Sequence, residues 1–309
     1  MLGLGKRRRQ LLFFSRGTGR GHAIVDAAIA NELGRLEPKL DVAFVSYDVG
    51  AATLKDLGQD VIDLEFSDDK PFWETMLRIA PLLQGQHPAL VVSHEEFCVP
   101  PLCKAFGLPV VSLADRFTNS DSPEMQALRY ADRVICLGDR GVYDEPPCLA
   151  GEVTYLGCVI RLLECEGFDE AGSRHALGIP PEATVVLVCP GGSEMHSEAC
   201  APLFDLVLKA YDALGFEEKR LIWIAGLADH DSFVEKSAQR GDLMILKPHY
   251  NFIPTLMTCD LVISKGNLRV LLECEALRIP TISISSSPDA LDDLRASRIQ
   301  TNVALRAGG

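Results

Sequence analysis

Short apolar runs alternate with longer amphipathic stretches in the first half of the chain. The runs, rich in Val, Ile and Leu, cover residues 11–14, 42–47, 89–93, 109–113 and 133–137. Helical patterns fill most of the gaps, at residues 23–36, 71–83, 100–106 and 124–130. Apolar strands separated by helices are typical of a parallel sheet that is covered on both faces. The pattern therefore predicts an α/β domain.

The same pattern resumes in the second half. Its apolar runs cover residues 184–189, 220–225, 243–246, 261–264 and 281–285. Between the halves, residues 163–174 are acidic, contain glycine and lack clear periodicity, which is typical of a linker. A chain of 309 residues also exceeds the usual span of one hydrophobic core. We therefore expect two doubly wound, Rossmann-like α/β domains, at residues 1–160 and 161–309.

Composition and charge narrow the class of protein. Hydrophobic residues make up 47% of the chain and charged residues 24%, as in globular proteins. No apolar run approaches the roughly 20 residues that a membrane helix needs. The net charge of -13 opposes binding to nucleic acid, so no nucleic-acid partner is expected. The basic start is followed by only four apolar residues, which favours a first strand over a secretory signal.

The ten cysteines include no C-x-x-C pair, and several lie inside apolar runs. This distribution is typical of free, buried thiols in a reducing compartment. We therefore expect a cytoplasmic protein with neither a disulfide framework nor a structural zinc site.

A glycine-rich turn containing Gly19, Gly21 and His22 joins the first apolar run to the first helix. Ligands of open α/β sheets bind beyond the carboxyl ends of strands, where such a turn lets backbone N–H groups approach them. The turn lacks the Gly-Lys-Ser/Thr of a P-loop, and His22 occupies the third glycine position of a dinucleotide fingerprint. A purely structural tight turn is the alternative. His22 itself could accept a proton from a hydroxyl group, although a lone histidine is more often structural.

A second glycine turn, Gly191, Gly192 and Ser193, follows the first strand of the second half and precedes a helix. Anion binding is physically available there, and a tight turn is again the alternative.

A third candidate is Lys265, Gly266 and Asn267, at the end of a strand, followed by a helix that carries Glu273. A carboxylate at that place can accept hydrogen bonds from a ribose diol while helix N–H groups hold a diphosphate. Lys265 would offset the negative charge.

Together these motifs resemble the GT-B glycosyltransferases, in particular the family that contains the peptidoglycan N-acetylglucosaminyltransferase (glycosyltransferase family 28). The family's N-terminal mark, a glycine-rich turn ending in Gly-His, is matched by Gly21 and His22. Its C-terminal mark is a small-residue turn, a glutamate and a proline seven residues later, matched by Gly266, Glu273 and Pro280. The order and spacing of these marks cover most of the chain.

The resemblance implies two Rossmann-like domains that face a central cleft, and transfer of a sugar from a nucleotide-sugar donor, expected to be a UDP-sugar, to an acceptor hydroxyl. The acceptor would be a lipid, a glycan or a small molecule, bound by the first domain, and a peripheral contact with a membrane is compatible with it. Attack opposite the diphosphate implies inversion. Neither a metal nor a separate cofactor is expected, since loop N–H groups can stabilise the leaving charge.

The resemblance also implies roles for single residues. His22 would be the general base or would position the acceptor, and Glu95 and Asp115 are further catalytic candidates. The residues expected around the donor, with Ile253 at the base and Glu273 at the ribose, are Gly19, Gly21, Gly191, Gly192, Ser193, Ile253, Lys265, Gly266, Asn267, Arg269 and Glu273. Arg269 departs from the family, which has a small hydroxyl or amide residue there. The second domain is also expected to be short at its C-terminus.

Two alternatives remain at this level. A non-hydrolysing sugar-nucleotide epimerase shares the two-domain plan and would need no acceptor. A donor-binding subunit with weak or absent catalysis would be favoured by Arg269 and the short C-terminus.

Overall fold

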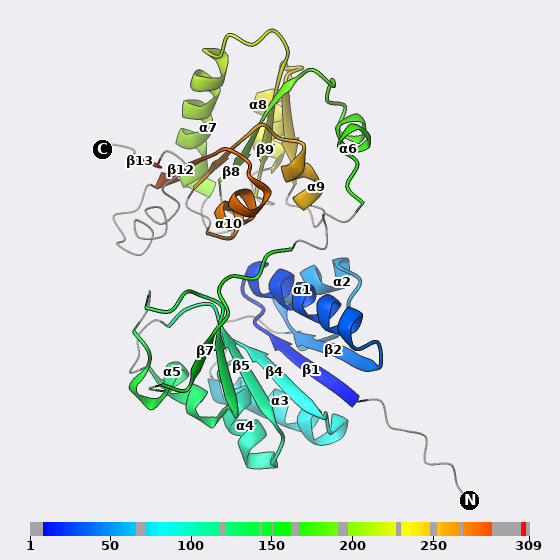
Figure 1. Ribbon diagram of the computed structural model, residues 1–309, viewed down its shortest axis with the longest axis vertical. Helices are drawn as coiled ribbons and strands as arrows, with labels where there is room; N and C mark the ends of the chain where they lie inside the picture. Colours follow the sequence, from blue (N-terminus) through cyan, green and yellow to red (C-terminus); the bar gives the residue numbers. More distant parts are fainter. Residues whose placement is uncertain are drawn as a thin grey trace, which may run out of the picture. The chain divides into compact units, whose positions relative to one another are not determined.

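The computed structural model describes residues 9–65, 72–117, 122–141, 144–149, 151–161, 167–190, 197–226, 230–247, 252–265, 268–285 and 304–306. The chain divides into two compact units, Met1–Val159 and Ile160–Gly309 (Figure 1). The boundary lies beside residue 160, where the sequence pattern changes.

The first unit is built on a parallel sheet of seven strands. In spatial order these are β3 (Val61–Asp63), β2 (Leu40–Ser46), β1 (Arg9–Ser15), β4 (Leu90–His94), β5 (Val110–Ala114), β6 (Arg133–Cys136) and β7 (Val153–Tyr155). Its helices are α1 (Gly21–Leu36), α2 (Asp48–Asp56), α3 (Phe72–Gln86), α4 (Val99–Phe106) and α5 (Pro123–Ala127), with 3-10 turns at Leu128–Tyr130 and Pro147–Leu149.

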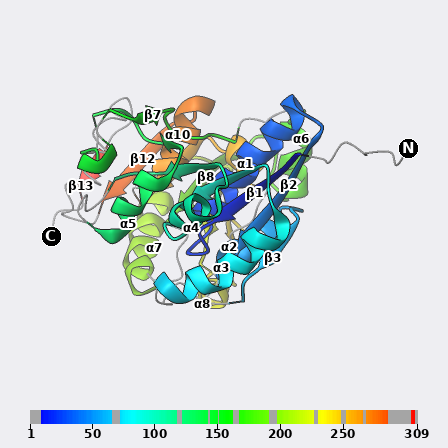
Figure 2. The ribbon, with the colours of Figure 1, turned by 90° about the horizontal axis from the view of Figure 1, so that it is seen from below.

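Alternate residues of β1 face opposite sides of this sheet, and each side has its own helices. Leu11 and Phe13 pack with Ala23 and Ala27 of α1, whereas Leu12 and Phe14 pack in a cluster with residues of α3 and α4. Figure 2 shows α3 and α4 from the side of the sheet that they cover. Because both faces are covered, the strand is apolar at every position from 11 to 14.

The second unit repeats this plan with a parallel sheet of six strands. In spatial order these are β10 (Leu243–Leu246), β9 (Lys219–Ile224), β8 (Thr184–Cys189), β11 (Leu261–Ser264), β12 (Thr281–Ser285) and β13 (Ala304–Arg306). Its helices are α6 (Glu170–Ala176), α7 (Ser197–Asp212), α8 (His230–Ser237), α9 (Phe252–Met257) and α10 (Leu268–Leu277). Residues of α7 and α8 pack on one face of the sheet, and residues of α9 and α10 on the other.

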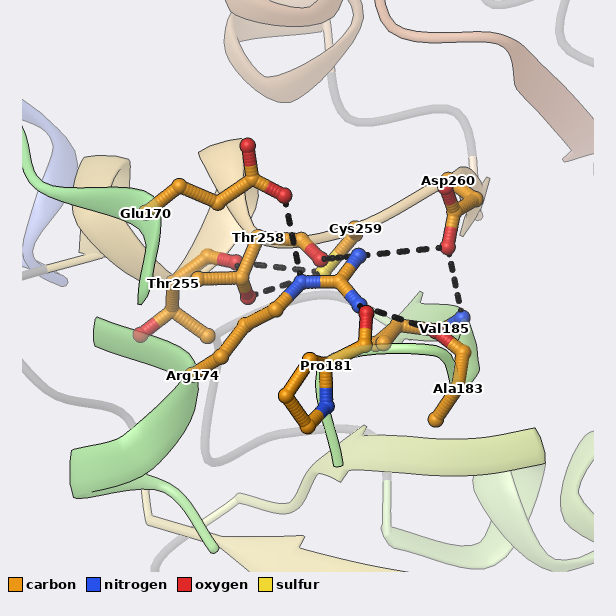
Figure 3. A network of polar contacts seen from close by, with 9 residues as sticks. All are labelled: Glu170, Arg174, Pro181, Ala183, Val185, Thr255, Thr258, Cys259 and Asp260. Atoms are coloured by element: carbon orange, nitrogen blue, oxygen red, sulfur yellow. Dashed lines mark hydrogen bonds and ion pairs between the residues drawn. The ribbon is translucent and has the colours of Figure 1, made fainter. Parts of the chain in front are cut away.

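A buried arginine fixes the amino-terminal edge of this second sheet (Figure 3). The Arg174 guanidinium on α6 donates hydrogen bonds to the backbone carbonyls of Pro181, Ala183 and Thr258 at 2.9–3.1 Å. It also lies 3.5 Å from Asp260, which accepts a bond from the Val185 amide. The contacts join α6, the start of β8 and the turn before β11. Arg174 is therefore structural and lies at the edge of the sheet opposite the carboxyl ends of the strands.

The predicted α/β class is confirmed, with local differences. The short strands Val61–Asp63 and Val153–Tyr155 carry too few residues for the apolar pattern to reveal them. Helix α6 lies inside the segment expected to be a linker. Its seven residues give little periodicity, and the hydrogen bonds of Arg174 hold it to the sheet.

Candidate functional site

The carboxyl ends of β1 and β4 form the point at which the first sheet reverses its strand order. The chain leaves β1 toward β2 on one side and leaves β4 toward β5 on the other, and crevices at such points are the usual ligand sites of α/β sheets. Ser15 pairs with His94 across the two strands, and the Arg16 amide donates to the His94 carbonyl at 3.3 Å. The glycine-rich turn therefore lies beside the Ser93–Glu96 loop.

Two glycines of the turn have a structural explanation, Gly17 in its packing and Gly19 in its backbone conformation. A Cβ atom at Gly17 would collide with the side chain and carbonyl oxygen of Tyr47. Gly19 has a φ of +70°, a backbone conformation that glycine adopts without strain. The Tyr47 hydroxyl in turn donates to Glu96 at 2.6 Å. The turn is thus tightly packed, as the structural alternative requires, and it also delivers His22 to the sheet edge at the start of α1.

Five side chains meet at this edge, and we call them the acid–histidine network: Asp26, His94, Asp115, His22 and Glu95. The His22 Nε2 atom lies 3.0 Å from Glu95 Oε2 and 4.0 Å from Asp115 Oδ2. The His94 Nδ1 atom lies 2.7 Å from Asp26, and its Nε2 atom lies 3.3 Å from Asp115. The two imidazole rings meet edge to face, with centroids 4.6 Å apart. The three predicted catalytic candidates therefore lie together.

The exposed fraction of the side chain differs between the members of the network. The Asp26 and His94 side chains are completely buried, whereas those of His22 and Glu95 are about 15% exposed and that of Asp115 is 35% exposed. A ligand outside the sheet edge can therefore reach Asp115 and the rim of His22, but not the inner pair.

The charges of the network perturb two of its members. Burial alone would lower the pKa of His94, but the carboxylates of Asp26 and Asp115 outweigh it and raise the pKa to about 10. Burial also opposes ionisation of Glu95, but the hydrogen bond from His22 and the positive charges of both histidines hold its pKa below the usual value. At neutral pH the network thus contains a His94 imidazolium and a Glu95 carboxylate.

Ligand-capable atoms of His22, His94 and Asp115 lie within 4.8 Å of one another, the spacing of a group that could meet a metal ion among the described residues. Two imidazoles and a carboxylate would suit a transition metal. Each of these side chains, however, already has a hydrogen-bonding partner inside the network. Hydrogen bonds alone therefore account for the arrangement, and the expectation of no metal stays a prediction.

The second sheet has an equivalent reversal point between β8 and β11. Cys189 pairs with Ser264 there, and the Lys265 amide donates to the Cys189 carbonyl at 3.1 Å. Lys265 therefore lies at the carboxyl edge of the sheet. The predicted phosphate-binding residues that lie outside the described part of the chain are Gly191, Gly192, Ser193, Gly266 and Asn267.

Glu273, the predicted ribose ligand, is completely buried on α10. Both of its carboxylate oxygens accept hydrogen bonds from Arg161, at 2.8 and 3.0 Å. Arg161 is itself buried and lies over the ring of Phe252. A ribose could reach Glu273 only after this pair separates. The ribose role therefore stays a prediction, with that added requirement.

The two other described candidates for the donor site, Ile253 and Arg269, differ in burial. The Ile253 side chain is buried in the core beside α10, which leaves only its backbone for a ligand, and its role at the base stays a prediction. Arg269 is half-buried in the first turn of α10.

Sequence reasoning missed three residues of these sites: Asp26, His94 and Arg161. Asp26 is a charged residue within the apolar first half of α1, four positions after His22, and this spacing was the available signal. Arg161 follows the apolar Val159–Ile160 step and carried no comparable signal.

Comparison with solved structures defines the class of fold. MurG of Acinetobacter baumannii matches with a TM-score of 0.60 at 12% identity, over 96% of this chain and 86% of that one. UDP-GlcNAc 2-epimerase of Neisseria meningitidis, bound to UDP-GlcNAc, matches with a TM-score of 0.69 at 14% identity, over 93% and 85%. The chain has the GT-B fold, as predicted.

Sequence comparison points to a particular family within that class, although no family model matches the chain. The UDP-N-acetylglucosamine--N-acetylmuramyl-(pentapeptide) pyrophosphoryl-undecaprenol N-acetylglucosamine transferase of Halalkalibacterium halodurans is 22% identical over 290 residues, which cover 87% of this chain and 77% of the relative. The resemblance inferred from the Gly-His turn and the Glu273 region is thus confirmed, at low identity.

Proposed function

We propose that this chain is a glycosyltransferase that moves a sugar from a UDP-sugar to an acceptor hydroxyl with inversion at the anomeric carbon. The observation that carries the proposal is the acid–histidine network at the reversal point of the first sheet. The donor named for the curated relative and the conserved strand order of both sheets support it. No separate cofactor takes part.

In this proposal His22 is the general base. Glu95 accepts a hydrogen bond from His22 Nε2, which leaves Nδ1 as the basic atom. Nδ1 is buried without a hydrogen-bonding partner in the structure, so the acceptor would reach it only after a local shift of the side chains that cover it. The acceptor O–H gives its proton to His22 as its oxygen bonds to the anomeric carbon. The bond from that carbon to the diphosphate breaks, and the diphosphate leaves with the electron pair. Asp115, the most exposed member of the network, would receive a hydrogen bond from the acceptor.

The donor belongs to the second unit in this proposal. Glu273 would accept hydrogen bonds from the ribose hydroxyls once it separates from Arg161. The released guanidinium would then offer its N–H donors to the diphosphate, the kind of charge-assisted contact for which arginine is suited. Lys265, the backbone of Ile253, Arg269 and the two glycine turns would complete the donor site.

An apolar patch on the first unit suits a lipid-linked acceptor. Phe72, Trp73 and Leu77 on α3 are between 43% and 65% exposed, and Trp73 and Leu77 lie one turn apart on the same helix face. Clustered exposed apolar side chains mark interaction surfaces. The patch would touch a membrane surface without crossing it. Among the described residues, no helix is long and apolar enough to span a membrane.

A reducing, cytoplasmic location completes the proposal. The nine described cysteines are free, and seven of them are buried.

The first experiment measures donor binding and transfer separately. UDP-, dTDP- and GDP-sugars are screened for a rise in melting temperature, and UDP release is then followed with lipid-linked and free glycan acceptors. We expect stabilisation by UDP-sugars, lost in Glu273→Gln, and acceptor-dependent UDP release. If no nucleotide sugar stabilises the chain, the proposal fails.

A second candidate function is the epimerase, because the bacterial UDP-GlcNAc 2-epimerase matches over most of the chain with a TM-score of 0.69. NMR of the sugar after incubation without an acceptor separates the two. A new epimer with the nucleotide still attached would support the epimerase. Donor stabilisation with no chemistry, unaffected by His22→Ala, would support a donor-binding subunit.

A further inference from the structure

Two charged residues of the first unit have no role in the mechanism above: Asp26 on α1 and His94 at the end of β4. Both side chains are completely buried. Placing two charged groups in a protein interior costs several kcal/mol for each ion, and apolar residues of similar volume often stabilise a fold as well or better. A buried pair of this kind is therefore weakly explained by stability.

The contacts of His94 point outward, toward the site. Its Nδ1 atom faces Asp26 Oδ1 at 2.7 Å, and its Nε2 atom faces Asp115 Oδ1 at 3.3 Å. As an imidazolium it donates one hydrogen bond to each carboxylate. The other Asp26 oxygen, Oδ2, is buried without a hydrogen-bonding partner, so the contacts of this carboxylate converge on His94.

The five residues form an alternating series of acids and histidines: Asp26, His94, Asp115, His22 and Glu95. The groups that face the inner pair come from three elements: His22 from α1, Glu95 from the loop after β4, and Asp115 from the loop after β5. Glu95 also accepts a hydrogen bond from the Asp115 amide at 3.1 Å, which holds the two acidic residues side by side. Two neighbouring carboxylates disfavour each other's charge unless a cation lies between or beside them.

We propose that Asp26 and His94 act as a buried positioning pair, which holds the Asp115 carboxylate at the site edge and places the His94 imidazole beside Asp115 and Glu95. The part of this inference that concerns the reaction rests on the proposed function. The pair touches neither donor nor acceptor. It acts through Asp115 and Glu95, and through Glu95 on the orientation of His22.

Three substitutions separate the hydrogen bond from the charge. Asp26→Asn keeps a side chain of the same shape opposite His94 but removes the counter-charge. His94→Asn retains a donor near the former Nδ1 position but cannot reach Asp115, whereas His94→Gln retains that reach without the charge. His87→Asn, an exposed histidine substitution on the same unit, and Leu83→Ala, a destabilising core substitution on α3, are the matched controls.

The primary measurement is the titration of the Glu95 carboxyl carbon by NMR in the ligand-free full chain, with the signal assigned by its absence in Glu95→Gln. We expect the pKa of Glu95 to lie below its usual value in the wild type and in both controls. In His94→Asn and His94→Gln it should rise above the wild-type value, because the charge of His94 no longer helps His22 to offset burial and the Asp115 charge. Melting temperatures are recorded for every variant.

The second measurement is transfer kinetics. For Asp26→Asn and His94→Asn we expect kcat to fall roughly 10- to 100-fold, with an unchanged donor KM and a pH profile whose acid limb moves to higher pH. His94→Gln should recover part of the loss. If His94→Asn does not fold, His94→Gln carries the titration test and Asp26→Asn the kinetic test.

The outcomes are distinct. An unchanged Glu95 titration in all folded variants overturns the positioning pair. A shifted titration in a protein that transfers no sugar supports the electrostatic part of the inference and counts against the proposed function. A fall in kcat that Leu83→Ala reproduces at equal loss of stability would show a merely structural role.

Discussion

The two units have the same strand order around their reversal points but very different chemistry there. In the first unit, the edge between β1 and β4 holds three carboxylates and two histidines, partly open to solvent. In the second, β11 is followed by α10, and Glu273 of α10 forms a buried ion pair with Arg161. The first network is formed in the absence of a ligand, whereas under the proposed function the second would have to exchange an internal ion pair for contacts with its ligand. If the proposal holds, the same fold supports a preorganised catalytic site and a site that opens on binding.

The largest effect should come from the preorganised side. His22→Ala removes the proposed general base, and we expect kcat for transfer to fall about 10²- to 10⁴-fold. Stabilisation by a UDP-sugar should be unchanged, since the donor is assigned to the second unit. Steady-state kinetics and melting curves test this, with His87→Asn as the control. Loss of donor binding in His22→Ala would contradict the assignment of donor binding to the second unit and of the general base to the first.

The next effect concerns the closed pair of the second unit. Arg161→Met leaves the buried Glu273 carboxylate without its partner, and the unfolding free energy should fall by about 3–5 kcal/mol. The double variant Arg161→Met/Glu273→Met should recover most of this loss. Urea unfolding followed by the fluorescence of Trp223, which is fully buried in the second unit, reports the change. Equal losses in the single and double variants would mean that the pair does not act as a unit.

The first unit should instead show a pH dependence set by His94. The pKa of His94 is raised in the folded chain to about 10, so its contribution to stability is complete below its unfolded value and is lost as the pH rises toward 10. The lowered pKa of Glu95 acts in the opposite range, with stability lost as the pH falls below the usual value of 4.5. Hydrogen exchange of the β1 amides between about pH 5 and pH 10, a range that covers the alkaline limit, should show protection falling at the alkaline end. His94→Gln should flatten that fall.

The smallest effect should come from an exposed ion pair in the first unit. Lys55 and Asp63 lie 2.6 Å apart with exposed side chains, and Lys55 contributes to the lowered pKa of Asp63. Solvent screening limits such pairs to about 0–1 kcal/mol. Lys55→Met should therefore change the unfolding free energy by less than about 1 kcal/mol, measured by urea unfolding at two salt concentrations. A larger change would mean that burial is a poor guide to the strength of ion pairs in this protein.

Much of the fold was predictable because its signals are local. The apolar runs of β1 and β8 predicted strands, since both faces of each sheet are covered and every position must be apolar. The Gly-His turn predicted a site at the end of β1, since a helix start and a strand end coincide there. Strands as short as β3 and β7 could not be predicted, because three residues carry no usable periodicity.

Much of the candidate site could not be predicted, because its contacts join distant residues. His22 and Glu95 are 73 positions apart, and Arg161 and Glu273 are 112 apart. In the sequence Asp26 is a single charged residue in a helix, and only the structure shows that His94 at the end of β4 lies beside it. Glu273 read as an open ribose ligand until its bonds with Arg161 were known.

The sequence by itself determined the class of fold, the position of the Gly-His turn and the identity of the side chains whose type allows proton transfer. Those properties depend on residue type and on neighbours within a few positions. Only the tertiary structure decided which acids face which histidines. It also decided that the Asp115 carboxylate is exposed to solvent and that the Glu273 carboxylate is buried against Arg161. Those pairings depend on the order in which parallel strands assemble, since the strand order brings together residues that the chain itself keeps far apart.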